Sequence, residues 1–225
     1  MKPTTAAALA LLISTVAAAP ADCAWRDIAA TDFSMSPPPS PGSLENDKDF
    51  SALLQYQAER SEADCALART QKSPDFHSLY DSSGLLSKTQ LAAVGPFLVE
   101  ASNFAASISG YFKKKFGRPR PYNEDPRIEP CADKPSGATA YPSTHATVAA
   151  LDACVLGRLF PAEAQPLAEY GKHLGDLRAI VGVHHPSDVA AGQDLAGQLC
   201  SRLLGESDFQ AELEKVRGAL APPAK

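Results

Sequence analysis

Residues 140–188 read AYPSTHATVAALDACVLGRLFPAEAQPLAEYGKHLGDLRAIVGVHHPSD, and this segment says the most about the architecture of the chain. A few kinds of polar residue recur in it at defined intervals, first as Pro142-Ser143-Thr144-His145 and then as Arg178, His184 and Asp188. Between them the segment is rich in alanine, leucine and valine at helical spacing. The basic run KKKFGRPRP at 113–121 precedes the segment. We expect these polar positions to lie at the ends of helices.

Residues 141–145 predict the start of a helix that continues through 146–151. Proline fits the first turn of a helix, where its missing N–H is no loss. The free amides of such a start, together with the positive end of the helix dipole, attract an anion. Ser143 would add a hydroxyl donor, and His145 would lie where it can protonate an oxygen of the bound group. Taken alone, these residues fit a helix cap with an incidental histidine equally well.

A second helix start is predicted at Pro186, with His184 just before it and Asp188 in its first turn. The i,i+4 spacing lets Asp188 accept a proton from one imidazole nitrogen of His184, so that the other nitrogen presents its lone pair. His185 is expected to face elsewhere. Arg178 lies six residues before His184 and suits two oxygens of a phosphate. The competing interpretation is that Asp188 only interacts favourably with the helix dipole, as an acidic residue in a first turn does.

The basic run supplies Lys113 and Arg120, with Pro121 making the segment around Arg120 rigid. A run of basic residues is ordinarily a solvated surface, and Lys114 and Lys115 are expected to be such a surface. Lys113 and Arg120 differ because they come directly ahead of the two histidine motifs. Three cations and two histidines at helix ends predict a site for a tetrahedral oxyanion.

The rest of the chain also favours helices. No run of alternating strands or internal repeat is present, so we predict an all-α helical bundle in a single domain over 22–225. His77 is expected in a solvated loop. The predicted helices cover about 46–70 with Asn46 as cap, 86–116 with a bend or restart at Pro96, 143–159, 161–181, 186–204 and 207–217. An extended proline-rich arm over 22–44, a loop over 118–141 and a frayed tail over 219–225 complete the prediction.

Residues 1–21 predict a secretory signal peptide, with Lys2 as a minimal basic start, an apolar run and small residues at the cleavage site. A retained membrane anchor is less favoured because the apolar run is shorter than the roughly 20 residues that span a bilayer. We expect no later segment to be apolar enough to cross a membrane. We therefore expect a periplasmic or secreted protein with no membrane contact after leader removal.

Five cysteines, Cys23, Cys65, Cys131, Cys154 and Cys200, fit an oxidising compartment, and one or two disulfides with a leftover thiol are expected. Cys154 and Cys200 would be bridged or simply buried. The formal net charge of −5 argues against a general nucleic-acid binder. Any attraction for anionic substrates must then be local.

The three motifs together resemble the signature of the phosphatidic-acid-phosphatase type 2 / vanadium haloperoxidase superfamily. The matching residues are Lys113 with Arg120-Pro121, Pro142-Ser143-Thr144-His145, and Arg178 with His184 and Asp188. The size expected of a soluble protein, the leader and the proline-rich arm make the chain most similar to the bacterial class A non-specific acid phosphatases. The resemblance covers most of the mature chain, weakly outside the motifs. It implies the helical bundle of that superfamily.

The resemblance also implies roles for these residues. His184 would attack phosphorus to give a phosphohistidine, Asp188 would orient His184, and His145 would protonate the leaving alcohol and then activate water. The phosphate oxygens would be held by Lys113, Arg120, Ser143, Arg178 and the amide of Thr144. No metal or cofactor is implied. The partners implied are small phosphate esters, with inorganic phosphate or vanadate as inhibitors, and a homodimer is compatible with the arm. A broad substrate range and an acidic to near-neutral pH optimum are expected.

Two positions depart from the family pattern. Thr144 replaces the usual glycine, which matters only if the site needs a positive φ, and Leu177 replaces the serine that usually precedes the arginine.

The sequence leaves two alternative functions open. One is a vanadate-dependent haloperoxidase, whose known members are generally longer chains. The other is a non-catalytic oxyanion-binding protein, which the retention of every charged and imidazole residue disfavours.

Overall fold

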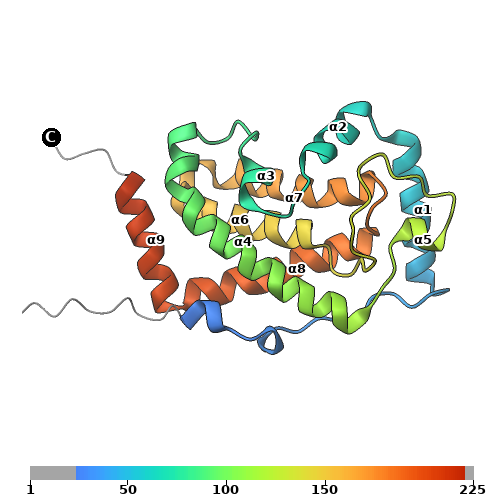
Figure 1. Cartoon of the computed structure of the whole chain (residues 1–225), viewed down its shortest axis with the longest axis horizontal. Helices are drawn as coiled ribbons and strands as arrows, with labels where there is room; N and C mark the ends of the chain where they lie inside the picture. The colour runs from blue at the N-terminus through green and yellow to red at the C-terminus, as the bar shows by residue number, and fades with distance from the viewer. Residues whose placement is uncertain (1–23, 221–225) are drawn as a thin grey trace, which may run out of the picture.

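The computed structural model describes residues 24–220, and within that range the chain forms nine α-helices and no strand (Figure 1). The prediction of an all-α bundle is therefore confirmed. The predicted leader, Cys23 and the last residues of the predicted tail lie outside the described residues. The elements in chain order are the 3-10 turns η1 Ala24–Asp27 and η2 Ala30–Asp32, then α1 Leu44–Glu59, α2 Glu62–Thr70, α3 Phe76–Tyr80, α4 Lys88–Phe116, α5 Pro121–Glu124, α6 Thr144–Leu159, η3 Pro161–Glu163, α7 Ala164–Ile180, α8 Pro186–Gly205 and α9 Ser207–Leu220.

Helix α6 forms the centre of the bundle, and α4, α7 and α8 pack around it (Figure 1). Its sequence is apolar almost all round, as expected for a buried helix, and most of its side chains are buried. Glycines let the neighbouring helices approach closely. A Cβ at Gly171 of α7 would lie 2.7 Å from the Ala149 carbonyl oxygen, and one at Gly192 of α8 would lie 2.6 Å from the Ser143 carbonyl oxygen. The second contact brings α8 against the start of α6.

The predicted helix over 46–70 is in fact two helices. Its cap is Ser43, whose hydroxyl accepts from the Asn46 amide, and α1 ends before Arg60. Ser61 then caps α2 in a capping box with Asp64. The chain turns between the two helices because each needs its own capped start, so Asn46 is not the cap and lies buried inside α1.

Helix α4 runs from Lys88 to Phe116 through Pro96 without a break and ends at Gly117, which has the left-handed φ of 63°. By length and composition it could cross a membrane, so the expectation that no later segment is apolar enough was wrong. In this structure 56% of its most apolar window is buried inside the bundle, as in the core helix of a soluble protein. Two short helices were not predicted: α3, which contains His77, and α5, which covers 121–124.

The arm that precedes α1 packs on its own chain. Trp25 is fully buried, edge-on to Phe104 of α4 and Phe209 of α9. Further along, the backbone of Ser34 exchanges hydrogen bonds with the side-chain amide of Gln198 on α8. The described part of the arm therefore covers the bundle itself, and a homodimer stays a prediction.

Two disulfides join distant parts of the chain. Cys154 of α6 is bonded to Cys200 of α8, which resolves the alternative between a bridge and simple burial. Cys65 of α2 is bonded to Cys131 in the loop before α6. The second bond matters for the site described below, because it ties together two segments that form its wall.

Candidate active site

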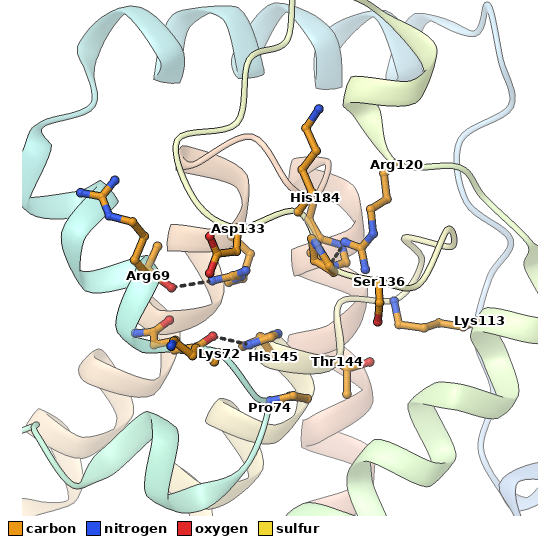
Figure 2. Close-up of a pocket in the computed structure, with 15 residues that line it drawn as sticks. Arg69, Lys72, Pro74, Lys113, Arg120, Asp133, Ser136, Thr144, His145 and His184 are labelled. Atoms are coloured by element: carbon orange, nitrogen blue, oxygen red, sulfur yellow. Dashed lines mark hydrogen bonds between the residues drawn. The ribbon is translucent and has the colours of Figure 1, made fainter.

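A polar pocket of about 380 Å³ opens beside the starts of α6 and α8 (Figure 2). Six of the eight predicted site residues line it, namely Lys113, Arg120, Thr144, His145, Arg178 and His184. The remaining wall comes from the end of α2 and from the loop after Cys131. Residues from five separate parts of the chain thus converge as the sequence predicts. Ser143 and Asp188 are buried behind this lining.

His184 lies between a carboxylate and a guanidinium. Its Nδ1 is 3.3 Å from Asp188 Oδ2, and its Nε2 is 3.0 Å from Arg120 Nη1. A guanidinium only donates, so Nε2 must accept and Nδ1 must carry the proton given to Asp188. This tautomer presents the Nε2 lone pair to the pocket. Burial and the charges of Lys113 and Arg120, opposed by Asp188, hold the pKa of His184 well below its ordinary value.

His145 lies on the other side of the pocket, beside the end of α2 (Figure 2). Its Nε2 is 3.1 Å from the backbone carbonyl of Gln71, which can only accept. Nε2 therefore carries a hydrogen, and Nδ1 is left to exchange a proton with a bound group. Burial, followed by the charge of Arg178, lowers the pKa of His145 well below its ordinary value. For both imidazoles the surroundings favour the neutral form.

A tight turn fixes Arg178 and His184 relative to each other. The Arg178 carbonyl accepts from the amides of both Val183 and His184 at 3.1 Å. Gly182 has a φ of 80°, which a side chain would resist, and it lets the chain turn back at this point. The interval of six residues between Arg178 and His184 is the length of this turn.

Three of the cations that line the pocket, Lys113, Arg120 and Arg178, form no ion pair with a carboxylate in the described part of the chain. Arg178 is 3% exposed, and its Nε is buried with no hydrogen-bond partner among residues 24–220. Burial and Arg120 lower the pKa of Arg178 to about 10. Lys113 donates to the Ala140 carbonyl at 2.8 Å, and burial and Arg120, partly offset by Asp188, lower its pKa to about 7. A bound anion would offset this excess of positive charge.

The start of α6 differs in detail from the prediction. The Ser143 hydroxyl accepts from the Ala146 amide as the helix cap, at 3.4 Å, and lies outside the pocket lining, so its contact with phosphate stays a prediction. Thr144 is helical, and among the described residues no residue other than glycine has a positive φ, so threonine fits here without strain. Its hydroxyl pairs with Ser109 Oγ at 2.8 Å. Leu177 is fully buried in a small apolar cluster with Ala68.

His185 stays outside the pocket lining, as expected, but it contacts Asp188, which was not expected. Its Nδ1 lies 3.1 Å from Asp188 Oδ2, so Asp188 contacts both neighbouring histidines. Only His184 reaches the pocket; His185 is fully buried against Phe50. Burial disfavours the ionised form of Asp188, but hydrogen bonds from the two histidines outweigh it and hold the pKa of Asp188 well below its usual range.

Sequence reasoning missed Arg118 entirely. This residue is 5% exposed and contacts Asp188 Oδ1 at 2.7 Å, on the side away from the pocket. The sequence offers no clear signal for this role, because Arg118 reads there as one more basic residue in a proline-rich loop. No group of three His, Cys, Asp or Glu side chains in the described ranges could hold a metal ion.

An all-helical bundle with two buried imidazoles facing two buried arginines and a partly buried lysine defines an oxyanion-binding protein with groups for proton and group transfer. Residues 97–204 match the model of the PAP2 superfamily, so this part of the chain belongs to that superfamily. It is 28% identical over 201 residues to an acid phosphatase of Zymomonas mobilis, covering 83% of this chain and 74% of the relative.

Shorter matches link the chain to non-specific acid phosphatases. Identity is 41% over 81 residues with that of Salmonella typhi, covering 36% of this chain and 32% of the relative. It is 33% over 89 residues with that of Providencia stuartii, covering 40% and 36%. In these two matches the chain spans only about a third of the length of each relative.

Proposed function

We propose that this protein is an acid phosphatase that hydrolyses phosphate monoesters of broad range through a phosphohistidine at His184, without a metal ion. The observation that carries the proposal is the tautomer of His184, whose Nε2 lone pair faces the cationic pocket while Nδ1 is held by Asp188. The names of the similar proteins support the reaction class.

In the first step Arg120 Nη1 turns from Nε2 of His184 to a phosphate oxygen, the freed Nε2 lone pair attacks phosphorus, and the bond from phosphorus to the ester oxygen breaks. The leaving oxygen is protonated through Nδ1 of His145, which passes on the proton of the bound ester monoanion, while its other nitrogen is fixed by the Gln71 carbonyl. Lys113, Arg120 and Arg178 stabilise the charge on the remaining oxygens. Preorganised donors of this kind typically contribute about 10²–10³-fold each.

In the second step a water molecule attacks the phosphohistidine. Neutral His145 accepts the proton from this water at Nδ1, the P–N bond breaks, and the electron pair returns to Nε2 of His184. Inorganic phosphate leaves with this proton, so His145 returns to its neutral form and the next ester supplies the next proton. The three cations do the work that a divalent ion does in many other phosphatases.

We also propose export, with residues 1–21 removed as a leader and the mature protein in the periplasm or the medium. The two disulfides support this proposal, because such bonds persist in oxidising compartments.

The test is hydrolysis of p-nitrophenyl phosphate by the purified protein in excess chelator, combined with acid-labile labelling from a ³²P-ester. We expect turnover, inhibition by vanadate, and a label that His184→Ala abolishes. His77→Ala is the matched control, because this exposed histidine on α3 pairs only with Asp81. Loss of turnover with chelator, or a label that survives in His184→Ala, would refute the mechanism.

A further inference from the structure

Arg118 joins three elements behind the pocket. Its Nη1 donates to Asp188 Oδ1 and to Ser187 Oγ, both at 2.7 Å. Its Nη2 donates to Asp49 Oδ2 at 2.8 Å and to Asn46 Oδ1 at 3.0 Å. One guanidinium, itself in the loop after α4, therefore fastens the first turn of α8 to α1. Its side chain is only 4% exposed, so these bonds are shielded from water.

The two oxygens of Asp188 have separate partners. Oδ1 accepts from Arg118, while Oδ2 accepts from the His185 amide at 2.9 Å and lies next to Nδ1 of both His184 and His185. Every charged or titratable group in direct contact with this carboxylate is thus one of three residues, and two of them are imidazoles. Arg118 is the only fixed charge among them, and it holds the oxygen that the histidines do not use.

The other end of the Arg118 side chain is fixed as well. Asp49 Oδ1 accepts from the Ser187 amide at 3.0 Å, and Asp49 Oδ2 is in contact with both the Ser187 hydroxyl and Arg118. The guanidinium lies between two buried carboxylates on different helices, so it is unable to follow Asp188 if that side chain rotates. This arrangement turns a freely rotating carboxylate into one with a defined orientation.

We propose that Arg118 is a positioning residue for the reaction at His184. By fixing Asp188 Oδ1 it aims Oδ2 at Nδ1 of His184, which in turn aims Nε2 at the pocket. The proposal rests on the proposed function and adds to it a residue outside the pocket that sets the aim of the nucleophile. Arg120, two residues later, contacts the opposite nitrogen of the same imidazole. The two arginines thus hold the His184–Asp188 pair from its two ends.

The proposal separates two quantities that a general structural role would change together. Anion binding depends on Lys113, Arg120 and Arg178, whereas the hydrogen-bond partners of Arg118 among the described residues are Asn46, Asp49, Ser187 and Asp188. Aim of the nucleophile depends on Asp188. A displacement of about 1 Å at a reacting group can lower a rate about 10²-fold. Loss of Arg118 should therefore slow phosphoryl transfer far more than it weakens the binding of an unreactive anion.

The experiment compares Arg118→Met and Arg118→Lys with Arg60→Met as the matched control. Arg60 also fastens the end of α1 to the loop before α6, by donating to the Glu129 carbonyl at 2.7 Å, but it has no contact with Asp188. The rate of phosphoenzyme formation at saturating p-nitrophenyl phosphate is measured by rapid quench, and the Ki of sulfate measures anion binding.

We expect Arg118→Met to form phosphoenzyme about 10- to 100-fold more slowly, with the sulfate Ki within about threefold of wild type. Arg118→Lys keeps the buried charge but lacks the planar guanidinium with its several donors, so its rate should lie between those of wild type and Arg118→Met. Arg60→Met should match wild type in both measurements. A wild-type rate in either folded Arg118 variant overturns the proposal, as does a loss of rate matched by an equal loss of sulfate binding. If the methionine variant does not fold, the lysine variant decides. Absence of phosphoenzyme in the wild type would instead refute the proposed function.

Discussion

Replacing Lys113 by methionine should remove the pH dependence of anion binding between about pH 6 and pH 9. The pKa of Lys113 is lowered to about 7 by burial and by the charge of Arg120. In the empty pocket this amine therefore loses its proton across a range in which the guanidinium groups of Arg120 and Arg178 stay charged. An anion binds best to the protonated amine, so binding must weaken as the pH rises through about 7.

The magnitude follows from the proton that must be taken up on binding. At about pH 8, one unit above the pKa of Lys113, only about a tenth of the protein carries the charged amine. Affinity then falls about tenfold, or about 1.4 kcal/mol. The decline continues at about tenfold per pH unit until it reaches the affinity of the neutral site. A charge-assisted hydrogen bond of about 1.5–3 kcal/mol places that limit about 10- to 100-fold below the value in acid.

Sulfate is the appropriate ligand because it stays a dianion over this range, so any titration belongs to the protein. The Ki of sulfate against p-nitrophenyl phosphate would be measured for wild type, Lys113→Met and the control Lys114→Met, whose lysine is exposed on the same turn of α4. The wild-type Ki should rise toward the constant value of Lys113→Met, and Lys114→Met should follow wild type. A flat wild-type curve, or an equal slope in Lys113→Met, would refute the assignment.

Three further predictions concern the scaffold. Burial raises the pKa of Asp152, so the native state binds more protons than the unfolded state above about pH 4, and wild type loses stability as the pH rises. Asp152→Asn lacks this loss, so its free energy of unfolding in urea should rise relative to wild type as pH increases. Parallel curves for the two proteins would contradict this. Removing the Cys65–Cys131 disulfide with two serines should raise KM more than it lowers kcat, because the bond joins two walls of the pocket; an unchanged KM in steady-state assays would count against it. Gly171→Ala should cost about 1–3 kcal/mol in urea unfolding, since its Cβ would meet the Ala149 carbonyl at 2.7 Å, whereas Gly218→Ala, with open space, should cost nothing.

The helices at the core of the fold could be predicted because their apolar positions have a clear period. Helices α6 and α8 start and end within a residue or two of the predicted bounds. The break between α1 and α2 was missed although the sequence contains its signal, since Ser61 and Asp64 have the spacing of a capping box. The apolar positions continue with helical spacing across this break, which hides the local signal in the sequence. The end of α4 was predicted correctly from three lysines followed by Gly117.

The pocket-lining residues could be predicted because their roles require particular residue types at intervals that reflect local turns. The partners behind them could not be predicted in the same way. Arg118 reads as one more basic residue in a proline-rich loop, and only the tertiary arrangement brings Asp49 of α1 close enough to bury it. The contact of Asp188 with His185 was also missed, because it depends on the side-chain rotamers at one helix start.

Burial of the site accounts for why acid conditions suit the proposed chemistry. Burial, followed by nearby positive charge, depresses the pKa of both His145 and His184, so His184 stays an uncharged nucleophile in acid. The same depression leaves His145 without the proton that it must give to the leaving group. A phosphate monoester has a second pKa of about 6, so below that value the substrate itself brings a proton into the pocket. Above about pH 6 the substrate lacks this proton, and the amine of Lys113 loses its charge around its own pKa of about 7. The two losses act in the same direction, so the activity should decline from near pH 6 upward.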